Sequence, residues 1–152
     1  MFPLGSFTSR NILTVSTAIA LGLLVVSCSE NKASQCNKLI GVANQAVQSV
    51  EEVTSTATPD NIDALNRIAT AAEQANQGMR NLSLGDQELR RFQERFVAMY
   101  DETNRATRAL VAAAQQKDAA ASQTAFEALK TATDKEAPLV DQVNQYCNAG
   151  VN

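Results

Sequence analysis

The side chains that could do chemistry in this chain are few, and three cysteines, Cys28, Cys36 and Cys147, stand out among them. The sequence contains no histidine. Its absence excludes Ser-His-Asp and Cys-His catalysis, ligation of haem by histidine and the Glu-x-x-His pairs of di-iron bundles. Too few ligands remain for a structural zinc site, and the sequence has no glycine-rich phosphate loop. We therefore expect a non-enzymatic protein with no catalytic residues, no metal site and no cofactor.

Cys28 follows a short apolar segment near the N-terminus. Residues 1–11 hold one basic side chain, Arg10, and no acid, and the 15 residues 12–26 then carry no charge. That run is shorter than the roughly 20 apolar residues that a membrane-spanning helix requires. A basic start, a short apolar run and small residues after it are typical of an export signal.

The end of this segment, Val25-Val26-Ser27-Cys28, resembles the lipobox of bacterial lipoproteins: an aliphatic residue, a tolerant position, a small residue and then Cys. The resemblance implies that the Cys28 thiol receives a diacylglycerol and that the signal peptide, residues 1–27, is cleaved off. Two or three acyl chains hold a small domain on a membrane durably, since each buried CH₂ adds roughly 0.8 kcal/mol. The alternative is an ordinary signal peptide or short anchor followed by a cysteine by chance.

The lipobox resemblance also implies a location. The predicted domain lies outside the cytoplasm, in the cell envelope, on the periplasmic or extracytoplasmic side of the membrane. In the sorting rule of two-membrane bacteria, an Asp directly after the lipidated cysteine keeps the lipoprotein in the inner membrane. This chain has Ser29 at that position, so the outer membrane is favoured over the inner one. Residues 28–34 are short and mostly polar, and we interpret them as a tether between the lipid and the folded part.

The composition of the mature part favours helices. Without residues 1–27 the chain has 125 residues, 12 of them basic and 16 acidic, which suits one domain and gives no indication of nucleic-acid binding. Aromatic residues are few, Trp is absent, and Ala, Gln, Asn and Thr are abundant. Such a composition favours helices with small side chains on their contact faces over sheets.

Apolar residues at alternating spacings of three and four predict four amphipathic helices. The first runs over about 35–57, and Thr58 and Pro59 begin a second that ends near residue 82. Asp86 caps a third helix that ends near residue 116, and Asp118 caps the fourth, which Pro138 should bend or split near Lys135. The stripe of the third helix is Leu89, Phe92, Phe96, Met99, Thr103, Ala106, Leu110 and Ala113, and that of the fourth is Ser122, Phe126, Leu129, Val140, Val143 and Cys147.

Short connections between long amphipathic helices give antiparallel neighbours. We therefore predict an all-α fold, an antiparallel up-down-up-down four-helix bundle formed by residues 35–152. In such a bundle Cys36, at the start of the first helix, and Cys147, at the end of the last, lie at the same end. Both cysteines are on core-facing stripes, and export would place them in an oxidising compartment. The sequence thus predicts a Cys36–Cys147 disulfide; the alternative is two buried free thiols.

Four polar residues interrupt the apolar stripes: Asn76, Thr103, Thr133 and Glu136. If they meet in one layer, they could form an internal site for a small polar ligand or for water; otherwise they turn to the surface. Arg90, Arg91 and Arg95 form a small basic cluster, which we interpret as surface rather than as an anion site because Glu88 and Glu94 offset its charge.

Two functions are consistent with these features. The first is a lipid-anchored interaction or assembly factor, bound to the membrane through Cys28 and to another envelope protein through a helical face. The alternative is a periplasmic binder of a small polar ligand in the bundle interior. In plan and anchoring the mature part resembles small four-helix lipoproteins of the cyanobacterial type, whose function is unknown, and those that attach to photosystem II, with which it shares no motif.

Overall fold

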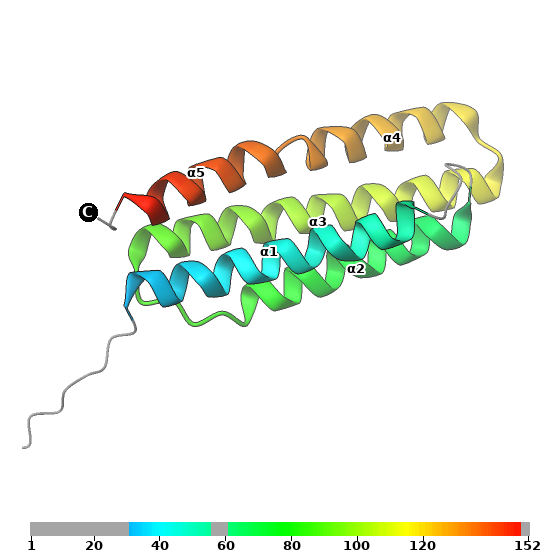
Figure 1. Cartoon of the computed structure of the whole chain (residues 1–152). Coiled ribbons are helices and arrows are strands. Elements are labelled where there is room, and N and C mark those ends of the chain that lie inside the picture. The colour runs from blue at the N-terminus through cyan, green and yellow to red at the C-terminus, as the bar shows by residue number, and fades with distance from the viewer. Residues whose placement is uncertain (1–30, 56–60, 150–152) are drawn as a thin grey trace, which may run out of the picture.

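In the computed structural model of the chain, residues 31–55 and 61–149 are described, and all regular structure in them is helical. The lipobox with Cys28 and the predicted cap at Thr58 and Pro59 lie outside the described residues. The helices are α1 (Lys32–Thr54), α2 (Ile62–Arg80), α3 (Gln87–Gln116), α4 (Ala119–Thr133) and α5 (Glu136–Asn148). They pack together as a four-helix bundle in which α4 and α5 make up the fourth arm (Figure 1).

The helix starts follow from their capping side chains. Asp86 and Asp118 cap α3 and α4 as predicted: the Asp86 side chain accepts two backbone N–H groups of the first turn of α3, and that of Asp118 accepts the Ala121 N–H. α1 begins at Lys32, three residues before the predicted start, because the Asn31 side chain accepts a bond of 2.8 Å from the Ser34 N–H. The helical part of the chain thus extends into the predicted 28–34 tether. α2 begins at Ile62 behind the cap Asn61, later than predicted.

The fourth arm is broken where Pro138 predicts a break. α4 ends at Thr133 and α5 begins at Glu136, with Asp134 and Lys135 between them. Pro138 is the third residue of α5 and has no N–H to donate to the carbonyl four residues earlier, that of Asp134. A continuous helix would need that bond, so the chain changes direction here.

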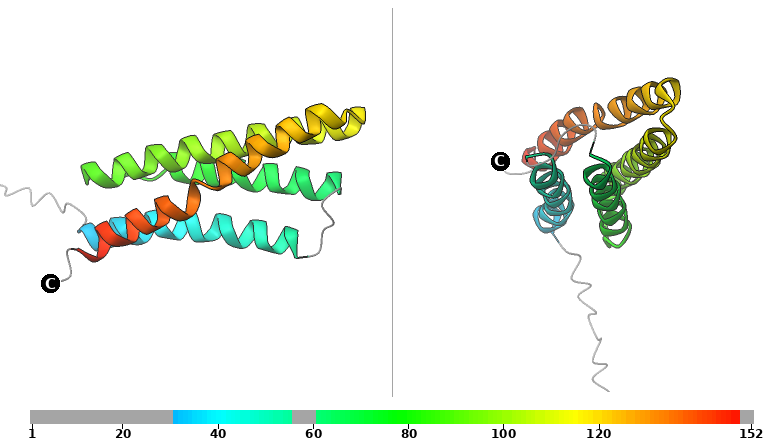
Figure 2. Two further views of the ribbon diagram at one scale, coloured as in Figure 1. Left: turned by 90° about the horizontal axis from the view of Figure 1, so that it is seen from above. Right: turned by 90° about the vertical axis from the view of Figure 1, so that its right-hand side faces the viewer.

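The break divides the neighbours of the fourth arm. α4 packs extensively along α3, whereas α5 packs against both α3 and α1. From above, α5 lies over α1 and α4 lies over α3, so the arm crosses the bundle obliquely (Figure 2, left). Seen along the bundle from the end with the α3–α4 turn, α4 leads away from α1 toward the outer side of α3 (Figure 2, right). The half of the bundle that contains α5 therefore has four packed arms, and in the other half α1 and α4 diverge.

Core side chains differ in size between the two halves. Leu39, Met79, Leu89, Phe96 and Val143 are almost completely buried in the half that contains α5. The α3 stripe is buried as predicted, apart from Leu110, which is half-buried while Val111 takes its place. In the α4 half the buried side chains are mostly alanines: Ala69, Ala71, Ala72, Ala106, Ala113, Ala125 and Ala132.

The predicted core face of α4 is wrong. Phe126 was expected on the buried stripe, but 53% of its surface is exposed, and Ala125 and Ala132 are buried instead. Alanines let the α4 backbone approach α3 closely, and they turn toward α3 because α4 has no other extensive neighbour in the described part. The face with Phe126 and Leu129, which would have met α1 in a closed bundle, is left partly open.

Several contacts fasten the α5 end of the bundle. The predicted disulfide is confirmed: Cys36 and Cys147 are bridged, with their Cα atoms 6.0 Å apart. The Tyr146 hydroxyl donates to Asp86 at 2.8 Å, and the Lys32 ammonium lies 3.7 Å from the centre of the Tyr146 ring. The first helix, the α2–α3 turn and the last helix are thus tied together at one end.

Buried Gln35 makes a further tie that the sequence pattern did not reveal. Its Oε1 accepts the backbone N–H groups of Gly85 at 2.7 Å and Asp86 at 2.9 Å, in the turn that joins α2 to α3. One side chain of α1 thereby fixes the turn at the start of α3.

Removal of the bridge should destabilise the protein strongly. The bond joins residues 111 apart in sequence, so its loss in a Cys36→Ala, Cys147→Ala double variant should cost up to about 4 kcal/mol of unfolding free energy in the chain-entropy model. Urea unfolding with and without reductant measures this: reductant should weaken the parent protein and leave the double variant unchanged. Two alkylatable thiols at positions 36 and 147 in untreated native protein would contradict the bridge.

Truncation of Gln35 should also destabilise the fold, because two backbone donors lose their acceptor. We expect Gln35→Ala to lower the unfolding free energy by about 1–2 kcal/mol. Gln45→Ala is a matched control, since Gln45 is an exposed glutamine on the same helix. Equal unfolding midpoints for the two variants would show that the Gln35 bonds contribute no stability.

Candidate binding cleft

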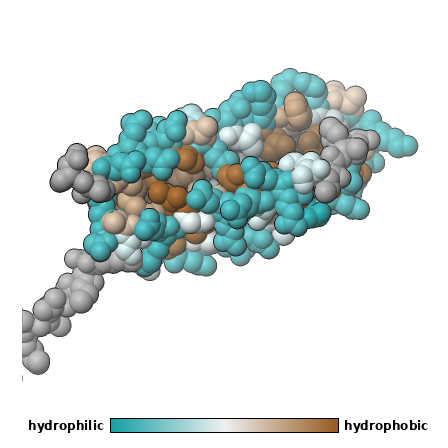
Figure 3. Space-filling model, in the orientation of Figure 1, coloured by the Kyte–Doolittle hydropathy of each residue, from teal (hydrophilic) through white to brown (hydrophobic). Residues whose placement is uncertain are grey.

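An apolar cleft of about 150 Å³ lies between α1, α2, α3 and the junction of α4 with α5. Val47 and Val50 of α1 form one wall and Ile68 and Ala72 of α2 another. Met99 of α3 is among the other side chains that line it. In the orientation of Figure 1, apolar side chains are visible in a trough that runs between the fourth arm and α1 (Figure 3). Apolar surface thus remains accessible within the bundle.

The course of the fourth arm accounts for the cleft. α5 closes the bundle against α1 at the bridged end, but beyond the break α4 follows α3, and α1 keeps α2 as its main neighbour without contact from the fourth arm comparable to that of α5. The small side chains Ala46, Ala71 and Ala72 do not fill the space between the diverging arms. The cleft is therefore produced by the same proline-associated break that splits the fourth arm.

Three of the four residues of the predicted polar layer line this cleft: Thr103, Thr133 and Glu136. Asn76 does not: its side-chain amide donates to the Val97 carbonyl at 2.8 Å and its oxygen accepts from Arg80. Asn76 thus joins α2 to α3 outside the cleft. The Thr133 hydroxyl donates to carbonyl groups of its own helix, at 3.1 Å. The cleft is consequently more apolar than the sequence pattern suggested.

Tyr100 and Glu136 form the polar part of the cleft wall. Tyr100 is not part of the predicted stripe of α3, yet only 4% of it is exposed, and its ring stacks on Phe96 with centroids 6.0 Å apart. Its hydroxyl donates to Glu136 Oε1 across a long distance of 3.5 Å. Burial raises the pKa of the Tyr100 phenol, and the charge of Glu136 raises it further. Tyr100 thus remains a neutral hydrogen-bond donor.

Glu136 is half-buried, and burial raises the pKa of its carboxyl above the ordinary value, although the bond from Tyr100 opposes the shift. Glu51 is the other ionisable carboxyl that lines the cleft. Nearby cations are engaged elsewhere: Arg67 lies 3.9 Å from Glu52, and Lys135 pairs with Glu102. Among the described residues no lysine or arginine lines the cleft, and the two charged groups that they place in its wall are both acidic.

The basic cluster at the start of α3 does not form an anion site, because its three arginines bind other groups of the protein. Arg90 donates to the carbonyls of Leu84 and Gly85 in the preceding turn, while Arg91 pairs with Glu88 and Arg95 binds Gln142. This agrees with the interpretation of these arginines as surface residues.

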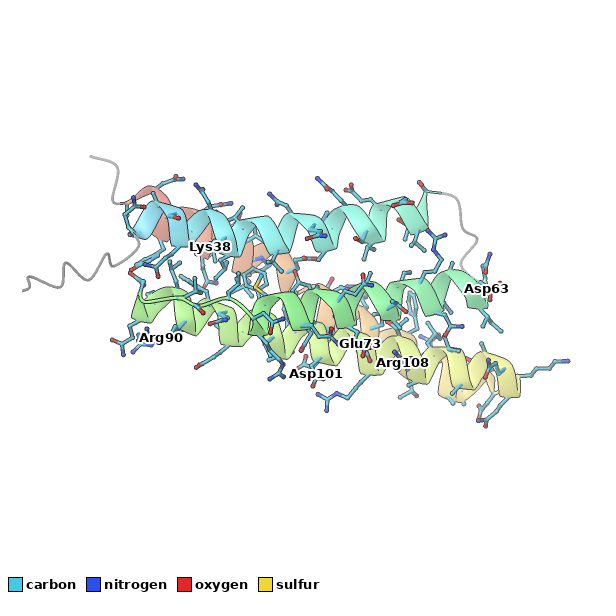
Figure 4. The ribbon with its side chains drawn as sticks, turned by 90° about the horizontal axis from the view of Figure 1, so that it is seen from below. Lys38, Asp63, Glu73, Arg90, Asp101 and Arg108 are labelled. Atoms are coloured by element: carbon cyan, nitrogen blue, oxygen red, sulfur yellow. A yellow bond between two sulfur atoms is a disulfide. The ribbon has the colours of Figure 1, made fainter. Side chains whose placement is uncertain are left out.

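The face of α2 and α3 away from the fourth arm is polar. Its labelled charges extend toward solvent (Figure 4), and Arg108 of α3 pairs with Glu73 of α2 at 2.8 Å. Within residues 31–55 and 61–149, no three Asp, Glu, Cys or His side chains could together hold a metal ion. Nor is any helix of the described part long and apolar enough to cross a membrane.

Replacement of the Glu136 carboxyl should stabilise the protein in a pH-dependent way. A raised native pKa means that the folded state favours the protonated form, so stability falls as pH rises through that pKa. Glu136→Gln removes this loss and should raise the unfolding free energy at pH 7 by about 0.5 kcal/mol, a small value because solvent screens a half-exposed group. The gain should vanish below the ordinary carboxyl pKa of 4.5.

Thermal unfolding of Glu136→Gln at several pH values measures this effect, with Glu94→Gln, an exposed position on α3, as the control. A gain that is the same at pH 4 and pH 7, or that Glu94→Gln matches, would contradict the assignment.

Comparison with known proteins adds no relative: no protein-family model matches the chain, and no curated protein or solved structure is significantly similar to it.

Proposed function

We propose that this protein is a lipid-anchored, non-enzymatic factor of the cell envelope that binds another envelope protein through the face between α1 and α4. The observation that carries this proposal is exposed apolar surface in the cleft wall on α1 and farther along α4. Val47 on α1 is 36% exposed and Phe126 on α4 is 53% exposed. Phe126 lies two helical turns from Thr133, on the same face of α4. Together with the open apolar cleft, these side chains offer a partner an apolar surface to cover.

Support for the anchor comes from the lipobox-like residues 25–28, which would be cleaved to leave lipid on Cys28. The outer membrane remains the favoured location, because Ser29 follows the cysteine. We also infer that the four arms run alternately up, down, up and down. The Cys36–Cys147 bridge supports this order, since it joins the start of α1 to the end of α5.

On this proposal the cleft lies at a distance from the membrane. The anchor precedes α1, and the first cleft residue, Ala46, comes 14 residues after Lys32. At a rise of 1.5 Å per residue, that is roughly 21 Å farther along the helix axis. A partner could therefore dock without contact between the cleft and the lipid headgroups.

A small polar ligand in the bundle interior is the alternative function, and the cleft gives it less support. A polar ligand needs several convergent hydrogen-bonding groups. Here the wall is mostly apolar, the Thr133 hydroxyl is used by its own helix, and Asn76 is bonded outside the cleft. An apolar group from a partner protein matches this lining better.

Affinity purification of the full chain from intact membranes tests the proposal. We expect one stoichiometric protein partner, and its yield should fall at least tenfold in Phe126→Glu, which places a charge on the apolar face. Thr124→Glu is the matched control, since Thr124 is an exposed residue on another side of α4 and the substitution adds the same charge.

Lipidation is tested in the same preparations by labelling with an alkyne fatty acid. Cys28→Ser should abolish labelling and release the protein from membranes, while the Cys36→Ala, Cys147→Ala variant keeps its label. If Phe126→Glu and Thr124→Glu recover the same partners, the docking face is wrong; if Cys28→Ser is still labelled, the anchor is wrong.

A further inference from the structure

We propose that the cleft selects an apolar side chain with a positive charge beside it, that is, an aromatic or large aliphatic residue of the partner next to a lysine or arginine. This inference rests on the proposed function, because it specifies the segment that docks on the face between α1 and α4. It is carried by two properties of the cleft, its size with its apolar lining and the sign of its charges.

The size of the cleft fits one ring. Its volume is about 150 Å³, and an apolar protein cavity of that size is known to accept benzene. Val47, Val50, Ile68 and Met99 supply apolar contact surface on several sides. A phenylalanine or leucine side chain from a partner would cover this surface, and the burial of apolar area favours its binding.

The charge of the cleft indicates which charge the partner should carry beside its apolar side chain. Glu51 is exposed and Glu136 half-buried, and both line the cleft. The nearby cations have other partners, since Lys135 pairs with Glu102 and Lys130 with Asp134. An anionic group that enters would face two carboxylates, whereas a cationic one would be attracted by both.

Glu136 has capacity to accept a cation. The bond that it accepts from the Tyr100 hydroxyl is 3.5 Å long, at the limit of hydrogen bonding, and engages Oε1. A carboxylate can accept several hydrogen bonds through its two oxygens. An ammonium or guanidinium group at the cleft would therefore pair with a carboxylate that is already partly desolvated, so less hydration would have to be displaced than at a fully exposed carboxylate.

Three capped dipeptides test the selection, with the full chain as receptor: Ac-Phe-Lys-NH₂, Ac-Phe-Glu-NH₂ and Ac-Gly-Lys-NH₂. The reporters are the ¹³C-labelled methionine methyl groups and tyrosine rings in NMR spectra. Met99 and Tyr100 line the cleft, while Met79 and Tyr146 lie elsewhere and serve as internal controls. We expect Ac-Phe-Lys-NH₂ to shift the Met99 and Tyr100 signals selectively, and to bind at least about fivefold more tightly than either other peptide.

Charge variants complete the test. Glu51→Gln and Glu136→Gln should each reduce the preference for Lys over Glu in the peptide, while Glu52→Gln should not, since Glu52 is the neighbouring residue but is outside the cleft wall. Equal affinities for the Lys and Glu peptides would overturn charge selection, and so would a preference that survives the double variant Glu51→Gln, Glu136→Gln. Tenfold tighter binding of benzylammonium than of Ac-Phe-Lys-NH₂ would indicate a small amine and overturn the polypeptide occupant.

The outcome is separate from that of the partner purification. If charge selection fails while Phe126→Glu still abolishes partner recovery, the docking face stands and the proposed chemistry of its occupant is wrong. Benzyl alcohol serves as the reference ligand for the apolar cleft. If none of the peptides shifts the Met99 or Tyr100 signals at 10 times the concentration at which benzyl alcohol shifts them, the cleft does not receive a peptide side chain and this inference is wrong.

Discussion

The break between α4 and α5 is the constraint on which the rest of this structure depends. Pro138 cannot donate the backbone bond that would continue the helix through Asp134, so the fourth arm consists of two helices with different neighbours. α5 completes a four-arm core. In the described residues, α3 is the one helix along which α4 packs extensively. The apolar cleft, the exposure of Phe126 and the burial of the α4 alanines are all consequences of that division.

The two halves of the bundle consequently differ in what holds them together. At the bridged end, large apolar side chains, the Cys36–Cys147 disulfide and the side-chain bonds of Gln35 and Tyr146 fix the helices to one another. Toward α4 the contacts are made mainly by alanines, which allow close approach but bury little area per residue. We interpret the first half as the part that maintains the fold and the second as the part available for binding.

Much of this fold could be predicted from local patterns. The α3 stripe, the Asp86 and Asp118 caps and the break before Pro138 depend on neighbours in sequence, and the disulfide followed from the order of the helices. The face of α4 could not be predicted, because Ala125 and Phe126 each continue a plausible stripe and the choice depends on which helix lies opposite. The burial of Tyr100, which is outside the predicted α3 stripe, could not be predicted for the same reason, because it depends on the α4–α5 junction, which no spacing rule places.

The candidate site was only partly predictable. Thr103, Thr133 and Glu136 were selected as polar interruptions of apolar stripes, and they do line one cleft. The apolar character of that cleft and the role of Val47 in its wall arise from the divergence of α4 and α1, a tertiary effect. No pattern within a single helix carries information about that divergence.

Nuclear Overhauser effects from the Phe126 ring in the full chain would show whether α4 diverges from α1 and leaves the cleft open. We expect no cross-peaks from this ring to the Val47 or Val50 methyl groups, together with clear cross-peaks from the Ala125 and Ala132 methyl groups to side chains of α3. Strong cross-peaks from Phe126 to the α1 valines would instead show a closed four-helix core with this ring inside it, and the divergence of α4 from α1 would then be wrong.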